Sequence, residues 1–346
     1  MKVDALLGGT LREAPAEGAA ARDLGYDGLW SAELAHDPFL PLVRAADEIG
    51  PQMELGTSIA VAFARSPMTL ANTAWDLQEL TGGRFVLGLG SQVKAHIERR
   101  FSMPWSKPAA RMRELVLAMR AIWASWQDGT KLQFEGEFYT HTLMTPMFSP
   151  APLPSGAPKV LVAAVGDAMT KVAAEVADGL LMHSFTTRRY VQEVTLPAIS
   201  AVLADSGRAR SDFQLAYTPF IVSGVDEQSM ADSARTARER IAFYASTPAY
   251  RPVLELHGWG ELQSELNELA RAGRWQQMGE LIDDEMLGTF AVVAPVDELA
   301  VAYAEWVRPL ADRTSFAPPA ELDADLKREL IAATRAHAIT LGQVSA

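Results

Sequence analysis

A histidine in a short acidic segment is the first group in the sequence that could do chemistry. His36 lies in the segment 33–37, directly before Pro38. An imidazole titrates near neutral pH and can exchange a proton with a substrate. We therefore take His36 as the leading acid–base candidate, and Glu33 as a group that orients it or acts in its place. A purely structural role for His36 in capping or packing the loop is the alternative, and His96 is a second candidate.

A glycine turn before a helical segment is the second feature. Residues 160–164 have the pattern of a buried strand, and residues 168–176 have that of a helix. Backbone N–H groups at a helix N-terminus favour an anion, because they lack partners and lie at the positive end of the helix dipole. We expect Val165, Gly166 and Asp167 to bind a phosphate group, and an ordinary helix cap by Asp167 is the alternative.

Other kinds of catalytic site find little support. The six histidines show no metal-binding spacing, the carboxylates show no calcium-loop pattern, and the chain has no cysteine. No serine lies in a nucleophile elbow, and a single glycine at position 166 does not make a dinucleotide-binding fingerprint. We therefore predict no metal site, and neither a hydrolase nor a metalloenzyme is favoured.

The composition is that of a well-cored globular protein. Of the 346 residues, 49% are hydrophobic and 21% are charged, and the formal net charge is −12. This acidic balance opposes binding to nucleic acid or to an anionic membrane. No apolar run is long enough to span a membrane, and no signal-peptide pattern is present. We expect a cytoplasmic protein whose partner is a small-molecule substrate.

Strand patterns and helix patterns alternate along most of the chain, which is typical of a parallel sheet with crossover helices. Seven or eight such units in a chain of this length fit a (β/α)₈ TIM barrel with insertions better than an open sheet. We expect residues 1–346 to form one domain, with insertions at about 131–158 and 246–287. The expected strands are 3–7, 28–31, 54–61, 85–90, 160–164, 179–182, 213–222 and 313–316, with a fragment at 290–293. The expected helices are 14–24, 38–49, 68–80, 109–126, 168–176, 188–203, 261–272, 275–286, 295–307 and 322–341.

Small and polar residues follow the expected strands, where a barrel of this type places its active site. Gly90, at the end of one strand, would let a ligand ring approach the backbone. The alternative is that a glycine at this strand end only eases packing within the barrel. A basic loop follows it, and His183 comes after the strand 179–182. Besides the turn at 165–167, the residues that we predict to bind a cofactor are Thr57, Ser58, Ile59, Gly90, Ser91 and Lys94.

Several segments together resemble the luciferase-like flavin or deazaflavin oxidoreductases. The similarity is clear over residues 1–185, weak over 290–340, and not recognisable between them. The segment from Gly90 to Phe101 is most similar to the branch that uses coenzyme F420, an 8-hydroxy-5-deazaflavin. The segments that carry the resemblance are Glu54-Leu55-Gly56-Thr57-Ser58-Ile59, Pro67-Met68-Thr69-Leu70-Ala71, Gly83-Arg84-Phe85-Val86-Leu87-Gly88-Leu89-Gly90, Leu161-Val162-Ala163-Ala164-Val165-Gly166 and Val176-Ala177-Asp178-Gly179-Leu180.

This resemblance implies a barrel with insertions that binds the flavin or deazaflavin ring at the C-terminal ends of its strands. It also implies a non-prolyl cis peptide at Ser58–Ile59 and a phosphate-binding turn at residues 165–167. The sugar-phosphate dehydrogenases of the F420 branch carry an Asp-His pair and a glutamate, where this chain has Glu33-Leu34 and Ser91. These departures argue against sugar-phosphate oxidation.

Three functions remain open at this point. The first is hydride transfer between C5 of coenzyme F420 and an organic substrate, in which the cofactor does the demanding chemistry. The second is an FMN-dependent monooxygenase of the same fold, and the third is a flavin-binding protein without catalytic activity. A homodimer is common in the family and is expected here. The walls of the substrate pocket are expected to come from the unrecognised region between residues 186 and 290.

Overall fold

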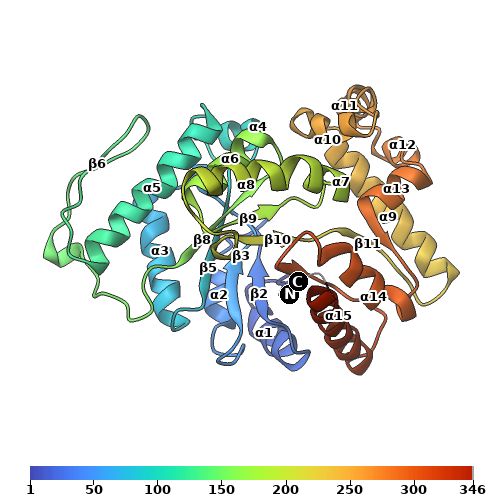
Figure 1. Ribbon diagram of the computed structural model, residues 1–346, viewed down its shortest axis with the longest axis horizontal. Helices are drawn as coiled ribbons and strands as arrows, with labels where there is room; N and C mark the ends of the chain where they lie inside the picture. The colour runs from blue at the N-terminus through green and yellow to red at the C-terminus, as the bar shows by residue number, and fades with distance from the viewer. Residues whose placement is uncertain (345–346) are drawn as a thin grey trace.

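Eight parallel strands close into a barrel at the centre of the molecule (Figure 1). The computed structural model describes residues 1–344. The strands pair in the order β1–β2–β3–β5–β8–β9–β10–β13, and β13 pairs with β1 to close the ring. This confirms the expected (β/α)₈ fold. The barrel strands are β1 (Lys2–Leu6), β2 (Gly28–Ser31), β3 (Glu54–Thr57), β5 (Phe85–Gly90), β8 (Lys159–Ala164), β9 (Gly179–Met182), β10 (Gln214–Tyr217) and β13 (Arg313–Ser315).

Helices surround the barrel. The helix after β3 starts where the sequence indicates, because Ser66 accepts a hydrogen bond from the Thr69 N–H and Pro67 occupies the first turn. Within residues 1–344, no helix is long and apolar enough to cross a membrane. The helices between successive barrel strands are α1 (Ala14–Asp23), α2 (Leu40–Ala45), α3 (Pro67–Leu80), α5 (Pro108–Gln127), α6 (Asp167–Val176), α7 (Arg188–Tyr190), α8 (Leu196–Asp205), α14 (Val296–Val307) and α15 (Ala324–Val344).

Two expected strands are interrupted. The strand expected over 54–61 is divided into β3 and β4 (Ala60–Val61), with a cis peptide bond between Ser58 and Ile59. The strand expected over 213–222 is divided into β10 and β11 (Phe220–Val222), since Pro219 has no N–H to continue the ladder. β11 leaves the barrel and pairs with β12 (Ala291–Val293), so the expected fragment at 290–293 is a strand outside the barrel.

Three helical segments also differ from expectation. The helix expected over 38–49 is only six residues long in α2, because the segment before it turns about Asp37, which accepts the N–H groups of Phe39 and Leu40. The basic segment after β5 contains a short helix, α4 (Lys94–Arg99), where a loop was expected. The helix expected over 275–286 is divided into two, and Asp283 caps the second.

Both insertions are present as additional structure. The first carries a hairpin, β6 (Phe134–Glu135) with β7 (Thr140–His141), whose turn donates three N–H groups to the Glu114 carboxylate. The second is helical, as expected, but a long helix that the sequence analysis missed precedes it. These helices lie together at one side of the barrel (Figure 1). They are α9 (Glu227–Ala245), α10 (Arg251–Leu256), α11 (Leu262–Arg271), α12 (Trp275–Glu280) and α13 (Asp284–Phe290).

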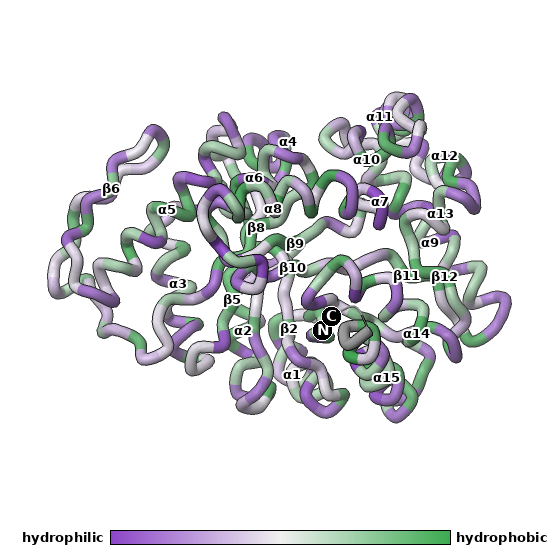
Figure 2. Tube along the Cα trace, in the orientation of Figure 1, coloured by the Kyte–Doolittle hydropathy of each residue, from purple (hydrophilic) through white to green (hydrophobic). Residues whose placement is uncertain are grey.

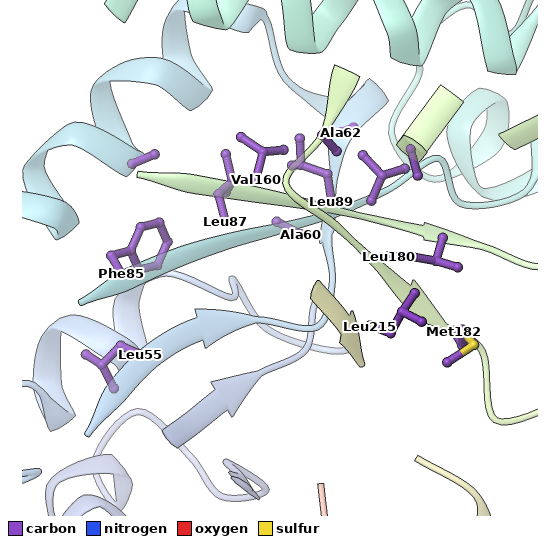
Figure 3. Close-up of a cluster of buried hydrophobic side chains, with 14 of the residues drawn as sticks. Leu55, Ala60, Ala62, Phe85, Leu87, Leu89, Val160, Leu180, Met182 and Leu215 are labelled. Atoms are coloured by element: carbon purple, nitrogen blue, oxygen red, sulfur yellow. The ribbon is translucent and has the colours of Figure 1, made fainter. Parts of the chain in front are cut away.

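Apolar side chains form a layer inside the barrel and a larger core around it. Figure 2 shows hydrophobic residues concentrated at the centre, around β5 and β8. On β5, alternate residues face the helices: Leu87 packs there beside Val160, its partner on β8 (Figure 3). A separate apolar cluster joins the helices α9–α13 to the loop after β9. The inner layer consists of Trp30, Val86, Leu161, Leu181 and Ala216.

One buried arginine connects most of the barrel strands. The Arg313 guanidinium donates two hydrogen bonds to the Asp4 carboxylate, at 2.8 and 2.9 Å, and one to Glu54 at 2.7 Å. It also donates to Gln214 at 3.2 Å and lies over the Trp30 ring at 4.6 Å. Arg313 and Asp4 are 1% and 2% exposed. The charge is therefore fully enclosed and depends on these partners.

We predict that Arg313→Met lowers the free energy of unfolding by about 3–5 kcal/mol, because Asp4 would remain buried without its partner. Denaturant unfolding followed by circular dichroism measures the loss. Arg328→Met is the matched control: this exposed arginine pairs with Asp325, and its loss should cost less than about 1 kcal/mol. Equal losses in the two variants would contradict the prediction.

Candidate active site

The loops that carry the predicted site residues lie next to one another at the C-terminal end of the barrel. They follow β2, β3, β5 and β8, which are consecutive in the ring, and β9 is the next strand. Because all the strands are parallel, these loops share one rim. The barrel therefore brings segments that are more than 130 residues apart in the chain around a single opening.

The rim is closely packed at the break between β3 and β4. The peptide bond between Ser58 and Ile59 is cis, as the resemblance implied. The Ser58 N–H donates to the Ser31 carbonyl at 2.7 Å, and the Glu33 N–H donates to the Ile59 carbonyl at 3.0 Å. A Cβ on Gly90 would lie only 2.8 Å from Ile59 Cγ1. Packing against Ile59 therefore already explains a glycine at position 90.

Thr57 joins β3 to β5 through its side chain. Its hydroxyl donates to the Gly88 carbonyl at 2.7 Å and accepts the Gly88 N–H at 2.9 Å. A Cβ on Gly88 would overlap the Thr57 carbonyl oxygen. The Thr57 hydroxyl is thus engaged in closing the barrel, and any contribution to a ligand comes through the backbone that it fixes.

An arginine holds the loop after β2, which contains both predicted catalytic residues. Glu33 is buried and accepts hydrogen bonds from Arg65 at 2.6 Å and from the Val61 N–H at 2.7 Å. Arg65 also pairs with Asp37 at 3.0 Å. His36 is exposed between these anchors, and its imidazole makes no hydrogen bond to another described residue. The carboxylate is a structural anchor, whereas the imidazole is accessible.

The predicted residues after β5 are more open. Ser91 is half-buried, and its hydroxyl donates to the Gln92 carbonyl at 3.1 Å. Lys94 is exposed at the start of α4, and its only ion pair within residues 1–344 is a long one with Glu98, at 3.8 Å. His96 is exposed on the same helix. Gln92 has a left-handed backbone, with φ of +59°, which marks a sharp turn at the strand end.

The turn after β8 is open where a ligand would approach. Gly166 is the N-cap of α6, no side chain caps the first N–H groups of this helix, and Asp167 instead pairs with Lys171 at 2.7 Å. The cap by Asp167 that we considered as an alternative is therefore not formed. A Cβ on Gly166 would meet no atom within 4 Å, and the φ of −82° suits any residue. Neither packing nor backbone conformation explains this glycine, whereas a bound phosphate would.

A neutral histidine lies at the end of β9. Burial, assisted by the positive charge of Arg240, lowers the pKa of His183 to about 4. His183 Nδ1 accepts the Phe185 N–H at 2.9 Å, so the proton of the neutral ring is on Nε2. The edge of its ring meets Tyr244 at a centroid distance of 4.6 Å, and Tyr250 lies at 5.0 Å. Tyr244 and Tyr250 belong to the helical segment 227–290, here called the insertion side. Two aromatic residues of the insertion side thus reach the rim of the barrel.

Arg240, Tyr244 and Tyr250 are not among the site residues predicted from the sequence. The first two lie on α9, in a stretch where no helix was expected. One signal was available: Asp226 and Ser229 form a capping box that marks the start of this helix. Nothing in the sequence showed that this helix would turn back to the end of β9.

Three cavities lie near these residues. A small one of about 30 Å³ lies inside the barrel, between Ser58, Trp30 and Arg313, and the buried Trp30 indole N–H has no hydrogen-bond partner there. A larger cleft of about 450 Å³ lies between α9 and α12, and its lining includes Arg240 and Tyr244. A third cleft, of about 490 Å³, is lined by Arg240, Phe220 and mainly polar residues of α9. Both clefts have the size of a small-molecule site.

Comparison with known proteins agrees with this architecture. The family model described as luciferase-like monooxygenase matches residues 2–313. The chain belongs to this family. An uncharacterized protein of Mycobacterium tuberculosis is 54% identical over 313 residues, which cover 90% of this chain and 92% of the relative. A second protein of that organism, named as a putative coenzyme F420-dependent oxidoreductase, is 27% identical and matches 83% of this chain and 85% of its own length.

The solved structures extend the comparison of the fold. The coenzyme F420-dependent tetrahydromethanopterin reductase from Methanopyrus kandleri superposes with a TM-score of 0.76 at 20% identity, covering 95% of this chain and 96% of that chain. Solved monooxygenases share the same fold. This luciferase-like chain thus shares its fold with a protein named as an F420-dependent reductase and with one named as a monooxygenase.

The rim suits a phosphate-bearing cofactor. In this luciferase-like protein the uncapped N-terminus of α6 and the free space at Gly166 fit an anionic group. Ser58, Ile59 and Ser91 are half-buried at the mouth, where a flat ring could lie against them. In the described part of the chain, no cluster of histidine and carboxylate side chains could hold a metal ion.

We predict that Gly166→Val weakens binding of intact F420 by about tenfold or more, about 1.4 kcal/mol, because the side chain would fill the space beside the α6 N–H groups. A deazaflavin truncated before the phosphate should bind to the Gly166→Val protein almost as tightly as to the unmodified protein. Fluorescence quenching measures both affinities. Gly288→Val, at another glycine with free space around it, is the control. Equal weakening of the two deazaflavins would show that the turn is only structural.

Proposed function

We propose that this protein is a coenzyme F420-dependent oxidoreductase that transfers a hydride between the deazaflavin C5 and a small organic substrate. The observation that carries the proposal is the open phosphate turn at Gly166 on a luciferase-like barrel whose relatives include proteins named as F420-dependent. Any phosphate-bearing cofactor would fit this turn, and the F420-dependent relatives favour the deazaflavin.

The proposed cofactor site joins four neighbouring loops. Gly166 and the first N–H groups of α6, with Val165 and Asp167 beside them, would bind the phosphate. The Ser58–Ile59 break and Ser91 would support the ring, and Lys94 would supply a positive charge near the mouth. Thr57 and Gly90 would act through the backbone, because their own positions are set by contacts within the protein. When bound, the deazaflavin would supply a carbon that accepts or donates a hydride.

The proton that accompanies the hydride needs a separate group. We propose that His36 exchanges this proton, since its imidazole is exposed and not engaged by another described residue. Its loop is nevertheless well fixed: Ser31 donates to the Pro38 carbonyl and Arg65 binds both Glu33 and Asp37. Glu33 would therefore act as a positioning residue and not as the acid or base itself.

The FMN-dependent monooxygenase is the second candidate. The family name and the monooxygenases that share this fold favour it. The phosphate turn would serve FMN equally well, so the two candidates differ in the ring and not in the anchor. A single domain over residues 1–346, a homodimer, a cytoplasmic location and the absence of nucleic-acid or membrane partners stay predictions.

We predict that the protein binds F420 more tightly than FMN. Fluorescence titrations with both cofactors at matched protein concentration measure the two dissociation constants. Tenfold or tighter binding of FMN would overturn the F420 assignment and favour the monooxygenase. Tight binding without turnover of any substrate would favour a cofactor-binding protein.

We predict that His36→Ala lowers turnover by about 10² to 10⁴-fold, the usual contribution of a general acid or base. The affinity for the cofactor should change little, and the pH–rate profile should lose one limb. Steady-state assays of deazaflavin absorbance and a cofactor titration measure these effects. His36→Gln keeps a hydrogen-bonding side chain and serves as the control. Full activity in that variant would refute the catalytic role.

A further inference from the structure

Arg240 and Tyr244 bring a cation and a phenol to the rim of the barrel. They lie four residues apart on α9, so they share one face of the helix. Tyr244 meets the His183 ring at 4.6 Å, and it lies 6.2 Å from the Phe220 ring. The Arg240 guanidinium carbon lies over that same Phe220 ring, 5.4 Å from its centroid. The four side chains therefore form one cluster between α9, β9 and β11.

The Arg240 charge in this cluster is not neutralised by the protein. Arg240 forms no ion pair with any carboxylate of residues 1–344. The adjacent Glu239 pairs with Arg235 at 3.4 Å. An exposed guanidinium held over an aromatic ring keeps its donors available to an anion.

Neutral donors accompany this cation. His183 presents Nε2–H, because its Nδ1 accepts the Phe185 N–H, and Nε2 has no partner among the described residues. The Tyr244 hydroxyl also makes no hydrogen bond in that part of the chain. One positive group and two neutral donors are a suitable set for a carboxylate or a phosphate.

The cluster lies beside the proposed cofactor turn. The last register pair between β8 and β9 joins Ala164 to Met182. Val165 directly follows Ala164, and His183 directly follows Met182. His183 therefore lies after β9 at the level where the turn at residues 165–167 lies after β8. A group bound at His183 would therefore be a neighbour of the cofactor.

The cleft next to the cluster has an apolar wall. Its volume is about 450 Å³, and its polar lining includes Arg240, Tyr244 and Glu239, whose carboxylate is paired with Arg235. Phe243 and Trp275 also line it, with ring centroids 6.1 Å apart. These two side chains are 51% and 53% exposed. Neighbouring large aromatic side chains exposed to this extent often mark a binding surface. Apolar walls with a few polar groups are typical of sites for small organic molecules.

We propose that Arg240, Tyr244 and His183 bind an anionic group, a carboxylate or a phosphate, of a substrate whose apolar part lies against Phe243 and Trp275. This proposal rests on the proposed function, because it assigns the substrate side of the same site. It makes the insertion side of the barrel the part that selects the substrate. The anion could also belong to the cofactor, and the experiment separates the two sources.

The test uses inorganic phosphate and acetate as probes of the full chain, by isothermal titration and by NMR of the histidine side chains. Saturable binding that shifts the His183 resonances is expected. Arg240→Met, which keeps the apolar stem over Phe220, should weaken probe binding at least about tenfold. Arg235→Met, at another exposed arginine of the same helix, should leave it unchanged. Thermal unfolding of both variants verifies that the fold is intact.

Three results would overturn the proposal. One is no detectable binding of either probe, and another is equal binding by the Arg240→Met and Arg235→Met proteins. The third is a tenfold loss of F420 affinity in Arg240→Met, which would assign the cation to the cofactor. Failure of the proposed function looks different: the unmodified protein would bind no F420, while probe binding would still depend on Arg240.

Discussion

The enclosed Arg313 guanidinium is the constraint on which the barrel depends. One planar group with five donors binds side chains from β1, β3 and β10 and lies over an indole from β2, so five of the eight strands meet at one charge. A buried cation holds its partners in fixed geometry, because any shift would leave it without a counter-charge. The strands are thereby fixed relative to one another, and so are their C-terminal ends at the rim.

At the rim, the residues divide into those that the protein itself uses and those that it leaves open. Thr57 is engaged with Gly88, Glu33 with Arg65, and Gly90 is set by Ile59. The Gly166 turn has no such internal explanation, and His36 has no partner among the described residues. This division separates groups that shape the site from groups that can contact a ligand.

The barrel and the insertion side have different roles in the proposed function. We propose that the barrel, with its open turn at Gly166, supplies the cofactor site, while the family match covers both the barrel and the insertion side, over residues 2–313. The helices α9–α13 have an apolar cluster of their own and contact the rim through His183, Tyr244 and Tyr250. A cofactor held by the barrel would leave substrate selection to the adjoining helices, because loops and insertions can change without disturbing the strands.

The sequence by itself determined the barrel, since alternating strand and helix patterns and glycine stops are local features. It also determined the candidate turn at Gly166 and, through a resemblance, the cis peptide at Ser58–Ile59. Only the tertiary structure decided that Glu33 is an anchor, that β11 pairs with β12 outside the barrel, and that Arg240 and Tyr244 meet His183. Those outcomes depend on contacts between residues tens of positions apart, and a single sequence carries no signal for such pairs.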